Sequence, residues 1–510
     1  MHIFQELYVI SDTHFGGEKD GVKNFQVFDR AERLSAFIKH ITDKNAEHDV
    51  GLVINGDMID SLAEPDVQGY VALDERSATK MMDRLYDDPS FSEVWKSLAS
   101  FIATQRHHLI LLLGNHDLEL ALPVVEHSLR KRLANGSSDA QSRMHFCTHG
   151  TGYRCSVGKA QVYCTHGNEF DDWNWVDQHK LSQLSNAMSS GRSVTPEDWK
   201  PNAGTRLVVD VMNTVKREFP FVDLLKPEKA AVATVLLALD RDLFSKVDLR
   251  DALPIFWNKG KGKAMTSRIL SAEAIDSTEL EASVPKVTEI LGSNMQSLIN
   301  SAPSDGNLLG NAIDALDFEE DIVSAPQGGT EVLGFGDIIA GKLGLVEKHE
   351  ALRNALLDWT SDVSGFDPTN DKDTQFKELK SRVGNDIDFV ITGHTHLCKS
   401  LPMPTGAHYF NTGTWIRLLK FTKASLENKE RFENEIWPAL LSGKMTDLDS
   451  LKIQSDDDAN DVSLRFDRTN AAHIYVEGSK TLGCLYRVTD GRGKKIKLER
   501  EPGTEIIESR

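Results

Sequence analysis

Five short apolar runs, each followed at once by a polar cluster, constrain this chain more than any other feature of its sequence. The runs have the length of buried strands, and each polar cluster begins where its strand would end. The runs are Leu7–Ile10 before Ser-Asp-Thr-His, Val50–Ile54 before Asn-Gly-Asp, Leu109–Leu113 before Gly-Asn-His-Asp, Gln161–Cys164 before Thr-His-Gly, and Phe389–Thr392 before Gly-His-Thr-His. Amphipathic helical stretches separate the first three runs, which predicts an α/β layered domain. Because loops at the carboxyl ends of strands converge in such sheets, we expect one site from all five clusters.

The strand pattern is interrupted between the fourth and fifth clusters. It stops after about residue 175 and resumes near residue 385. Between them the sequence has helical periodicity over Arg206–Phe219, Glu228–Val247 and Asp337–Trp359. We therefore predict a first core segment at 1–175, a helical insertion at 176–384 and a second core segment at 385–510.

Charge argues against general binding to polyanions, with one local exception. The chain carries a formal net charge of −19, and an acidic surface repels nucleic acid unless a basic patch outweighs it. Residues 200–268 contain 13 Lys+Arg against 8 Asp+Glu, a local balance of +5. Within them lies a glycine-interleaved basic cluster, which we interpret as a solvated loop or, alternatively, as a phosphate contact. Its members are Lys259, Lys261, Lys263 and Arg268.

Cysteine usage and apolar run length indicate a cytoplasmic protein without a membrane span. The five cysteines are odd in number and contain no C-x-x-C pair, as is typical of free thiols in a reducing compartment. The apolar stretch near the start is too short for a secretory signal. The longest apolar run, Ala230–Leu239, is half the roughly 20 residues that a bilayer span requires.

The polar clusters contain side chains that bind transition metals. These are Asp12, His14, Asp57, Asn115, His166, His394 and His396. Imidazoles mixed with carboxylates and an amide oxygen favour Mn²⁺, Fe or Zn²⁺ over the oxygen-only sites of Ca²⁺ or Mg²⁺. In extended D-x-H and H-x-H units, residues i and i+2 point to the same side and can reach one centre. His149, in a second Thr-His-Gly, competes with His166; we prefer His166 because it ends a predicted hairpin.

Taken in order, these clusters resemble the five motifs of the calcineurin-like metallophosphoesterase superfamily. The matching units are Asp12-x-His14, Gly56-Asp57, Gly114-Asn115-His116-Asp117, His166-Gly167 and Gly393-His394-x-His396. The context is also similar to the branch that contains UDP-2,3-diacylglucosamine hydrolases, which often carry Arg at the position of His116. The resemblance implies a four-layer α-β-β-α sandwich, here with a large and mainly helical insertion.

The resemblance also implies a role for each residue. A first metal would take Asp12, His14, Asp57 and His396, and a second would take Asp57, Asn115, His166 and His394, with Asp57 bridging. Two divalent ions, Mn²⁺ before Fe, Zn²⁺ or Ni²⁺, would hold a bridging hydroxide for in-line attack on phosphorus. His116 is the candidate for protonating the leaving oxygen or stabilising transition-state charge, with Asp117 orienting its ring.

Three functions fit these residues. The first is a hydrolase of a small phosphorylated compound such as a nucleotide, a sugar nucleotide or another phosphodiester. The second is a metal-dependent nuclease that uses the basic part of the insertion, and the third is a regulatory or scaffold protein on the same fold. We expect the insertion to cap the site or to contact an oligomer partner or another protein. Trp173 and Trp175 would either line the substrate or pack against the insertion.

Overall fold

The computed structural model describes most of the chain in two compact units. The described residues are 2–18, 26–64, 72–171, 174–213, 219–225, 347–360, 363–442, 444–456, 460–493 and 495–510. The first unit comprises Met1–Pro227, Asp362–Lys420 and Arg465–Arg510, and the second comprises Glu228–Ser361 and Phe421–Leu464. All five polar clusters belong to the first unit.

An eight-stranded sheet carries the first three clusters. Its order is β17-β16-β15-β2-β3-β4-β5, with β18 pairing β16. Four strands are mutually parallel: β2 (Glu6–Ile10), β3 (Val50–Asn55), β4 (His107–Leu112) and β5 (Met144–Cys147). The antiparallel strands are β15 (Thr469–Glu477), β16 (Lys480–Asp490), β17 (Ile496–Arg500) and β18 (Ile507–Glu508). The parallel register therefore brings the carboxyl ends of β2, β3 and β4 to one edge.

A six-stranded sheet carries the other two clusters. Its order is β1-β6-β7-β8-β10-β9. The strands are β1 (Ile3–Phe4), β6 (Tyr153–Val157), β7 (Ala160–Cys164), β8 (Phe389–Thr392), β9 (Lys399–Pro402) and β10 (His408–Asn411). β7 and β8 pair in parallel, with Val162 opposite Phe389. The clusters that follow these two strands are thus neighbours, although more than 200 residues separate them in sequence.

The two sheets pack face to face over an apolar core. Inward side chains of both sheets are buried together, including Leu7, Val53 and Ile110 from one sheet and Val162 and Phe389 from the other. Burying one such side chain stabilises the fold by about 1.5–3 kcal/mol. The parallel strands are covered on both faces, which explains why their sequences are continuous apolar runs rather than alternating ones.

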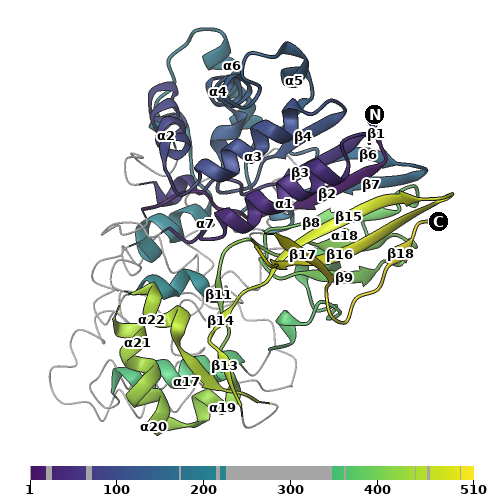
Figure 1. Ribbon diagram of the computed structural model, residues 1–510. Coiled ribbons are helices and arrows are strands. Elements are labelled where there is room, and N and C mark those ends of the chain that lie inside the picture. Colours follow the sequence, from purple (N-terminus) through teal and green to yellow (C-terminus); the bar gives the residue numbers. More distant parts are fainter. Residues whose placement is uncertain are drawn as a thin grey trace, which may run out of the picture. The chain divides into compact units, whose positions relative to one another are not determined.

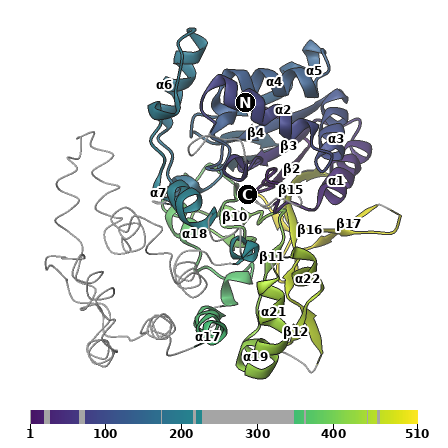
Figure 2. The same ribbon diagram turned by 90° about the vertical axis from the view of Figure 1, so that its left-hand side faces the viewer.

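Helices cover the outer faces of the sheets (Figure 1). On the eight-stranded sheet, α1 (Ala31–Lys44) and α3 (Ser92–Ala103) lie side by side (Figure 2) and bury one apolar face each, as the sequence periodicity predicts. Three more helices follow on this side: α2 (Glu75–Asp87), α4 (Pro123–Leu133) and α5 (Ser138–Ser142). On the other sheet, α18 (Thr374–Leu379) packs Phe376 and Leu379 against Val390 and Tyr409. The order of helix, sheet, sheet and helix confirms the predicted α/β sandwich.

The rest of the first unit consists of short elements. They are α6 (Gln178–Ser189), α7 (Ala203–Arg206), a π-helical turn at Leu207–Met212, and the paired strands β11 (Leu418–Leu419) and β14 (Arg465–Phe466). Among the described residues, no helix has the length and apolar character needed to cross a membrane.

The second unit is mainly helical where it is described. It contains α17 (Lys348–Thr360), α19 (Lys423–Glu427), α20 (Lys429–Arg431), α21 (Trp437–Leu441) and α22 (Met445–Ser450), with the strand pair β12 (Lys452–Gln454) and β13 (Asp461–Ser463). Residues 421–464 group with 228–361 here, whereas the predicted boundaries assign them to the second core segment. The helix predicted at Glu228–Val247 lies outside the described residues, and the boundaries of the insertion stay a prediction.

Candidate metal centre

Asp12, His14 and His396 form the first of the groups of possible metal ligands at the carboxyl edge of the sheets; a further group there, His14, Asp60 and His116, shares His14 with it. Asp12 and His14 follow β2, and His396 follows β8. The ligand atoms of all three lie within 4.8 Å of one another. His396 Nε2 lies 3.2 Å from Asp12 Oδ1 and 3.0 Å from His14 Nε2. Strands from two different sheets therefore bring their end loops to one point.

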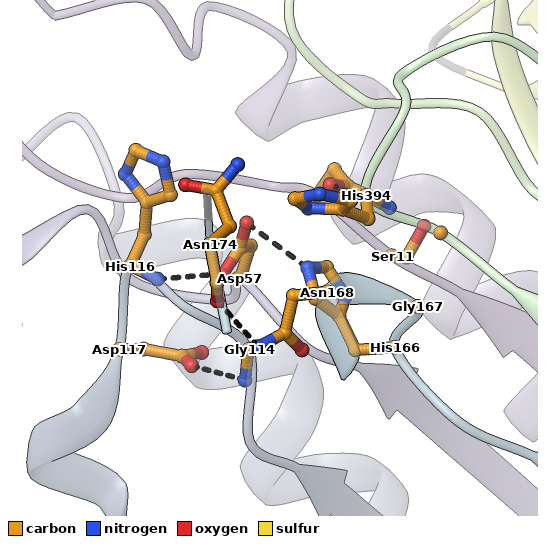
Figure 3. Close-up of polar contacts among 12 residues, drawn as sticks. Ser11, Asp57, Gly114, His116, Asp117, His166, Gly167, Asn168, Asn174 and His394 are labelled. Atoms are coloured by element: carbon orange, nitrogen blue, oxygen red, sulfur yellow. Dashed lines mark hydrogen bonds and ion pairs between the residues drawn. The ribbon is translucent and has the colours of Figure 1, made fainter. Parts of the chain in front are cut away.

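Asp57, His166 and His394 form the second group. They follow β3, β7 and β8, and their ligand atoms also lie within 4.8 Å of one another. Asp57 Oδ2 lies 3.1 Å from His166 Nε2 and 3.9 Å from His14 Nε2 of the first group. Figure 3 shows Asp57 between His116 and His166, with His394 beyond His166. The carboxylate of Asp57 thus lies between the two groups.

The backbone of the site adopts conformations that side chains other than glycine rarely take. Five of the seven described non-glycine residues with positive φ are candidate ligands. Their φ values are 54° for Asp12, 48° for His14, 51° for Asp57, 71° for His394 and 61° for His396. Such residues cost about 1–3 kcal/mol each and gather at functional sites, where the surrounding structure enforces them.

Glycines make room for the candidate ligands. A Cβ on Gly114 would lie closer to Asp57 Oδ1 than van der Waals contact permits, and one on Gly56 would collide with the His166 ring. A Cβ on Gly393 would collide with Ser11 and with the Asp12 carboxylate. The glycine before Asp57, Asn115 and His394 therefore permits close approach of a neighbouring side chain.

The comparisons with known proteins agree with these motifs. Residues 6–219 match the family model described as calcineurin-like phosphoesterase. The chain is similar to that family over this part of its length. The match includes the first four clusters and ends before the fifth, at 393–396. The pairing of β7 with β8 brings this fifth cluster next to the fourth, which follows β7. The protein is accordingly a metal-dependent phosphoester hydrolase.

Two further comparisons add little about this phosphoesterase. No curated protein matches the chain. Among solved structures it is similar to a dimetal phosphatase from Danio rerio, with 11% sequence identity, a TM-score of 0.28, and coverage of 97% of this chain and 98% of that one. A TM-score of this size does not establish a common fold.

The residues at the phosphoesterase site fit divalent cations. Asn115 Oδ1 is buried and has no hydrogen-bond donor in the part of the chain that the structure describes. A buried carbonyl oxygen without a donor costs free energy unless a cation or a water satisfies it. The surrounding imidazole nitrogens and carboxylate oxygens are donors that Mn²⁺, Fe and Zn²⁺ accept.

Burial and neighbouring imidazoles decide which of these groups is charged. Burial opposes ionisation of Asp57, but His166 and His116 outweigh burial and hold the pKa of this carboxyl well below its ordinary range. Burial, reinforced by the nearby His116, lowers the pKa of His14 to about 3. His14 is therefore neutral at pH 7, which is the form of imidazole that binds a metal ion.

His116 lies beside the two groups, and Asp60 contacts its ring. His116 Nδ1 is 3.1 Å from Asp60 Oδ1, while the His116 backbone N–H donates to Asp57 Oδ1 at 2.9 Å. Asp117, expected to orient the His116 ring, instead accepts from the backbone N–H groups of Met58 and Gly114 at 2.7 Å each. Asp60 is not among the residues predicted from the sequence; its position three residues after Asp57 is the signal that could have found it.

Asp171 is a second carboxylate at the site that the motifs did not identify. Its Oδ2 lies 3.0 Å from His394 Nε2, and both residues are buried. Asp171 is in the polar loop that follows His166, a stretch of sequence rich in functional groups. It therefore supplies an acidic neighbour for His394.

The structure separates the two Thr-His-Gly sequences. His166 follows β7, is fully buried and faces Asp57, with its Nδ1 2.8 Å from the carbonyl oxygen of Asn55. His149 is exposed in the loop before β6. Trp175 is 42% exposed. Trp173 and the basic cluster Lys259, Lys261, Lys263 and Arg268 lie outside the described residues.

Proposed function

We propose that this phosphoesterase uses two divalent ions, Mn²⁺ in the first place, to hydrolyse a phosphate ester or pyrophosphate bond of a small phosphorylated compound. Nucleotides, sugar nucleotides and other phosphodiesters are the substrate classes we favour. The observation that carries the proposal is the pair of adjacent ligand groups with the Asp57 carboxylate between them. Such a pair of ions, when bound, acidifies water and offsets charge on the phosphoryl oxygens.

We assign the ligands as two overlapping sets. One ion would be held by Asp12, His14, Asp57 and His396, and the other by Asp57, Asn115, His166 and His394. The first set is supported by the 3.0–3.2 Å contacts of His396 with His14 and Asp12. The second is supported by the burial of Asp57, His166 and His394, and by the unsatisfied oxygen of Asn115. The mixed nitrogen and oxygen donors favour Mn²⁺ and leave Fe, Zn²⁺ and Ni²⁺ as alternatives.

We assign His116 to the substrate rather than to the ions. Its side chain is 21% exposed, whereas that of His166 is 0% exposed, so substrate can reach the former. Its Nδ1 lies 3.1 Å from Asp60 Oδ1, and this contact orients the ring. The ring would either donate a proton to the leaving-group oxygen or stabilise negative charge in the transition state.

The proposal extends to location and partners. All five cysteines are free and four are buried, which supports the expected reducing, cytoplasmic location. A capping role for the insertion, and contacts of the insertion with an oligomer partner or another protein, remain expectations from the sequence. Nuclease activity is the second candidate, favoured only by the local charge of +5 over residues 200–268.

An activity screen of metal-free protein tests the proposal. We expect added Mn²⁺ to restore turnover on a phosphodiester, phosphomonoester or nucleotide, with DNA a poorer substrate. Asp57→Asn should lower that turnover by at least about 100-fold, because loss of the shared carboxylate uncouples both ions. Full activity of Asp57→Asn at saturating Mn²⁺ would exclude the two-ion assignment.

A further inference from the structure

Three histidines gather at the edge of the sandwich opposite the catalytic loops. They are His2, which precedes β1, His108 on β4 and His145 on β5. Each lies two residues before a side chain of the inter-sheet core or one packed against it, namely Phe4, Ile110 and Cys147. Because strand residues i and i+2 share a face, His108 and His145 lie on the inner face of their sheet, and the His2 ring lies beside that of His145, with centroids 4.4 Å apart.

These histidines are far from the candidate catalytic centre. β4 carries His108 near its start and leads to Asn115 beyond its end, seven residues later. At the rise of an extended strand, seven residues span about 20 Å. A ligand bound by the three histidines would therefore occupy a site separate from the one that cleaves phosphate esters.

The three imidazoles are close enough to share one ion. Their candidate ligand nitrogens lie within 4.8 Å of one another. His108 Nδ1 and His145 Nε2 are 3.1 Å apart, and two nitrogens bound to a tetrahedral Zn²⁺ are separated by about 3.4 Å. The His2 ring centroid lies 4.4 Å from that of His145 and 5.3 Å from that of His108. The His2 nitrogen lies within 4.8 Å of the other two, and its approach to them would complete a three-nitrogen set.

A neighbouring hydroxyl orients the third histidine. The hydroxyl oxygen of Tyr153 lies 3.2 Å from His2 Nδ1, which leaves His2 Nε2 for an ion. A hydrogen bond to the second ring nitrogen is the arrangement that orients metal-binding histidines in proteins. All three histidines are half-buried, so solvent can reach the cluster and supply a fourth ligand.

We propose that His2, His108 and His145 bind a Zn²⁺ ion that ties the two sheets together. His2 precedes the first strand of the six-stranded sheet, while His108 and His145 belong to the eight-stranded sheet. Three imidazoles without a carboxylate among them select Zn²⁺ and its late first-row neighbours over Mn²⁺, Mg²⁺ or Ca²⁺.

Zinc stoichiometry of the full chain tests the proposal. Metal-free wild type, His145→Gln, His2→Asn and the control His179→Gln are saturated with Zn²⁺, desalted and analysed for bound metal. His179 is an exposed residue of α6 that contacts Gln183. We expect one fewer equivalent of Zn²⁺ in His145→Gln and in His2→Asn than in wild type and the control. Mn²⁺-dependent hydrolysis should be equal in all four proteins.

Thermal unfolding gives a second readout. Zn²⁺ should raise the Tm of wild type and His179→Gln by more than it raises that of His2→Asn, because only the first two retain the inter-sheet ion. His2→Asn changes a residue outside the regular strands, so it serves even if His145→Gln does not fold. Equal Zn²⁺ content and equal Tm shifts in all folded variants would overturn the proposal and leave the cluster as a hydrogen-bonded histidine pair with the tilted ring of His2 beside it.

Discussion

At the scale of single residues, the site depends on side chains whose backbone is held in an unfavourable conformation. Asp12, His14, Asp57, His394 and His396 all have positive φ, a backbone region that residues other than glycine rarely adopt. Such conformations cost about 1–3 kcal/mol each, so the surrounding fold has to supply the compensating free energy. Bound metal ions would add to this compensating free energy.

Asp60 should act on the reaction through His116. Asp60→Asn keeps the shape of the side chain but removes the charge that faces His116 Nδ1. We expect kcat to fall by about 10- to 100-fold with Mn²⁺ content unchanged. The double variant Asp60→Asn/His116→Ala should be no slower than His116→Ala alone, as measured by steady-state kinetics. Independent, multiplicative losses would show that Asp60 does not work through His116.

The two Thr-His-Gly histidines should differ in metal content. His166→Ala removes a buried imidazole 3.1 Å from Asp57 Oδ2, so bound Mn²⁺ should fall by about one equivalent per chain. His149→Ala changes an exposed loop residue and should leave metal content as in wild type. Elemental analysis of the purified variants decides between them; the reverse pattern would reassign the ligand to His149.

At the scale of secondary structure elements, a buried carboxyl supports the loop between β4 and α4. Glu119 lies in a 3₁₀ turn (Leu118–Ala121), is 1% exposed, and accepts a hydrogen bond from the Ala72 backbone N–H at 2.7 Å. Burial raises the pKa of this carboxyl to about 7. The buried surroundings of the turn therefore favour the protonated, uncharged form of Glu119.

Glu119 should make the fold less stable as pH rises. Its folded pKa is above the unfolded pKa, so the folded state binds more protons between the ordinary value of 4.5 and about 7. The stabilisation is fully present below the unfolded pKa and is lost as pH rises through the folded pKa, by at most a few kcal/mol. Glu119→Gln keeps the acceptor for Ala72 and should raise Tm more at pH 8 than at pH 5. Equal shifts in thermal denaturation at both pH values would contradict this account.

At the scale of the whole molecule, the distribution of charge along the chain distinguishes a small-molecule hydrolase from a nuclease. The chain has a net charge of −19, so any binding of nucleic acid has to come from the basic stretch at 200–268. Contacts with phosphates release counterions and make affinity fall steeply with salt. A small-molecule hydrolase needs no such surface.

Reversing the charge of the three lysines in the basic cluster tests which of the two functions the protein has. The triple change Lys259→Glu, Lys261→Glu and Lys263→Glu should alter turnover of a small phosphodiester by less than about twofold. If the protein is a nuclease, the same change should abolish DNA binding or make the affinity for DNA much less dependent on salt. Each lysine that neutralises a phosphate contributes about one unit to the slope of log affinity against log salt concentration. Fluorescence anisotropy with labelled DNA at several salt concentrations measures the effect. The control for a change of net charge alone is a triple variant in which Lys80 on α2, Lys96 on α3 and Lys131 on α4 are changed to Glu.

The sequence by itself determined the α/β layering and the set of polar clusters at the strand ends. Both follow from local properties, because apolar runs form buried strands, amphipathic stretches form helices, and parallel strands bring their carboxyl ends to one edge. The order of the clusters was enough to predict the family whose model matches residues 6–219.

Only the tertiary structure decided which side chains face each other. The contact of Asp60 with the His116 ring, the burial of His166 beside Asp57 while His149 is exposed, and the gathering of His2, His108 and His145 depend on strand register and sheet packing. These contacts join residues far apart in the chain; His394, for example, donates its backbone N–H to Asp12 across 382 positions. A shift of one residue in register would turn each side chain to the opposite face, and composition and spacing within one run do not specify that register.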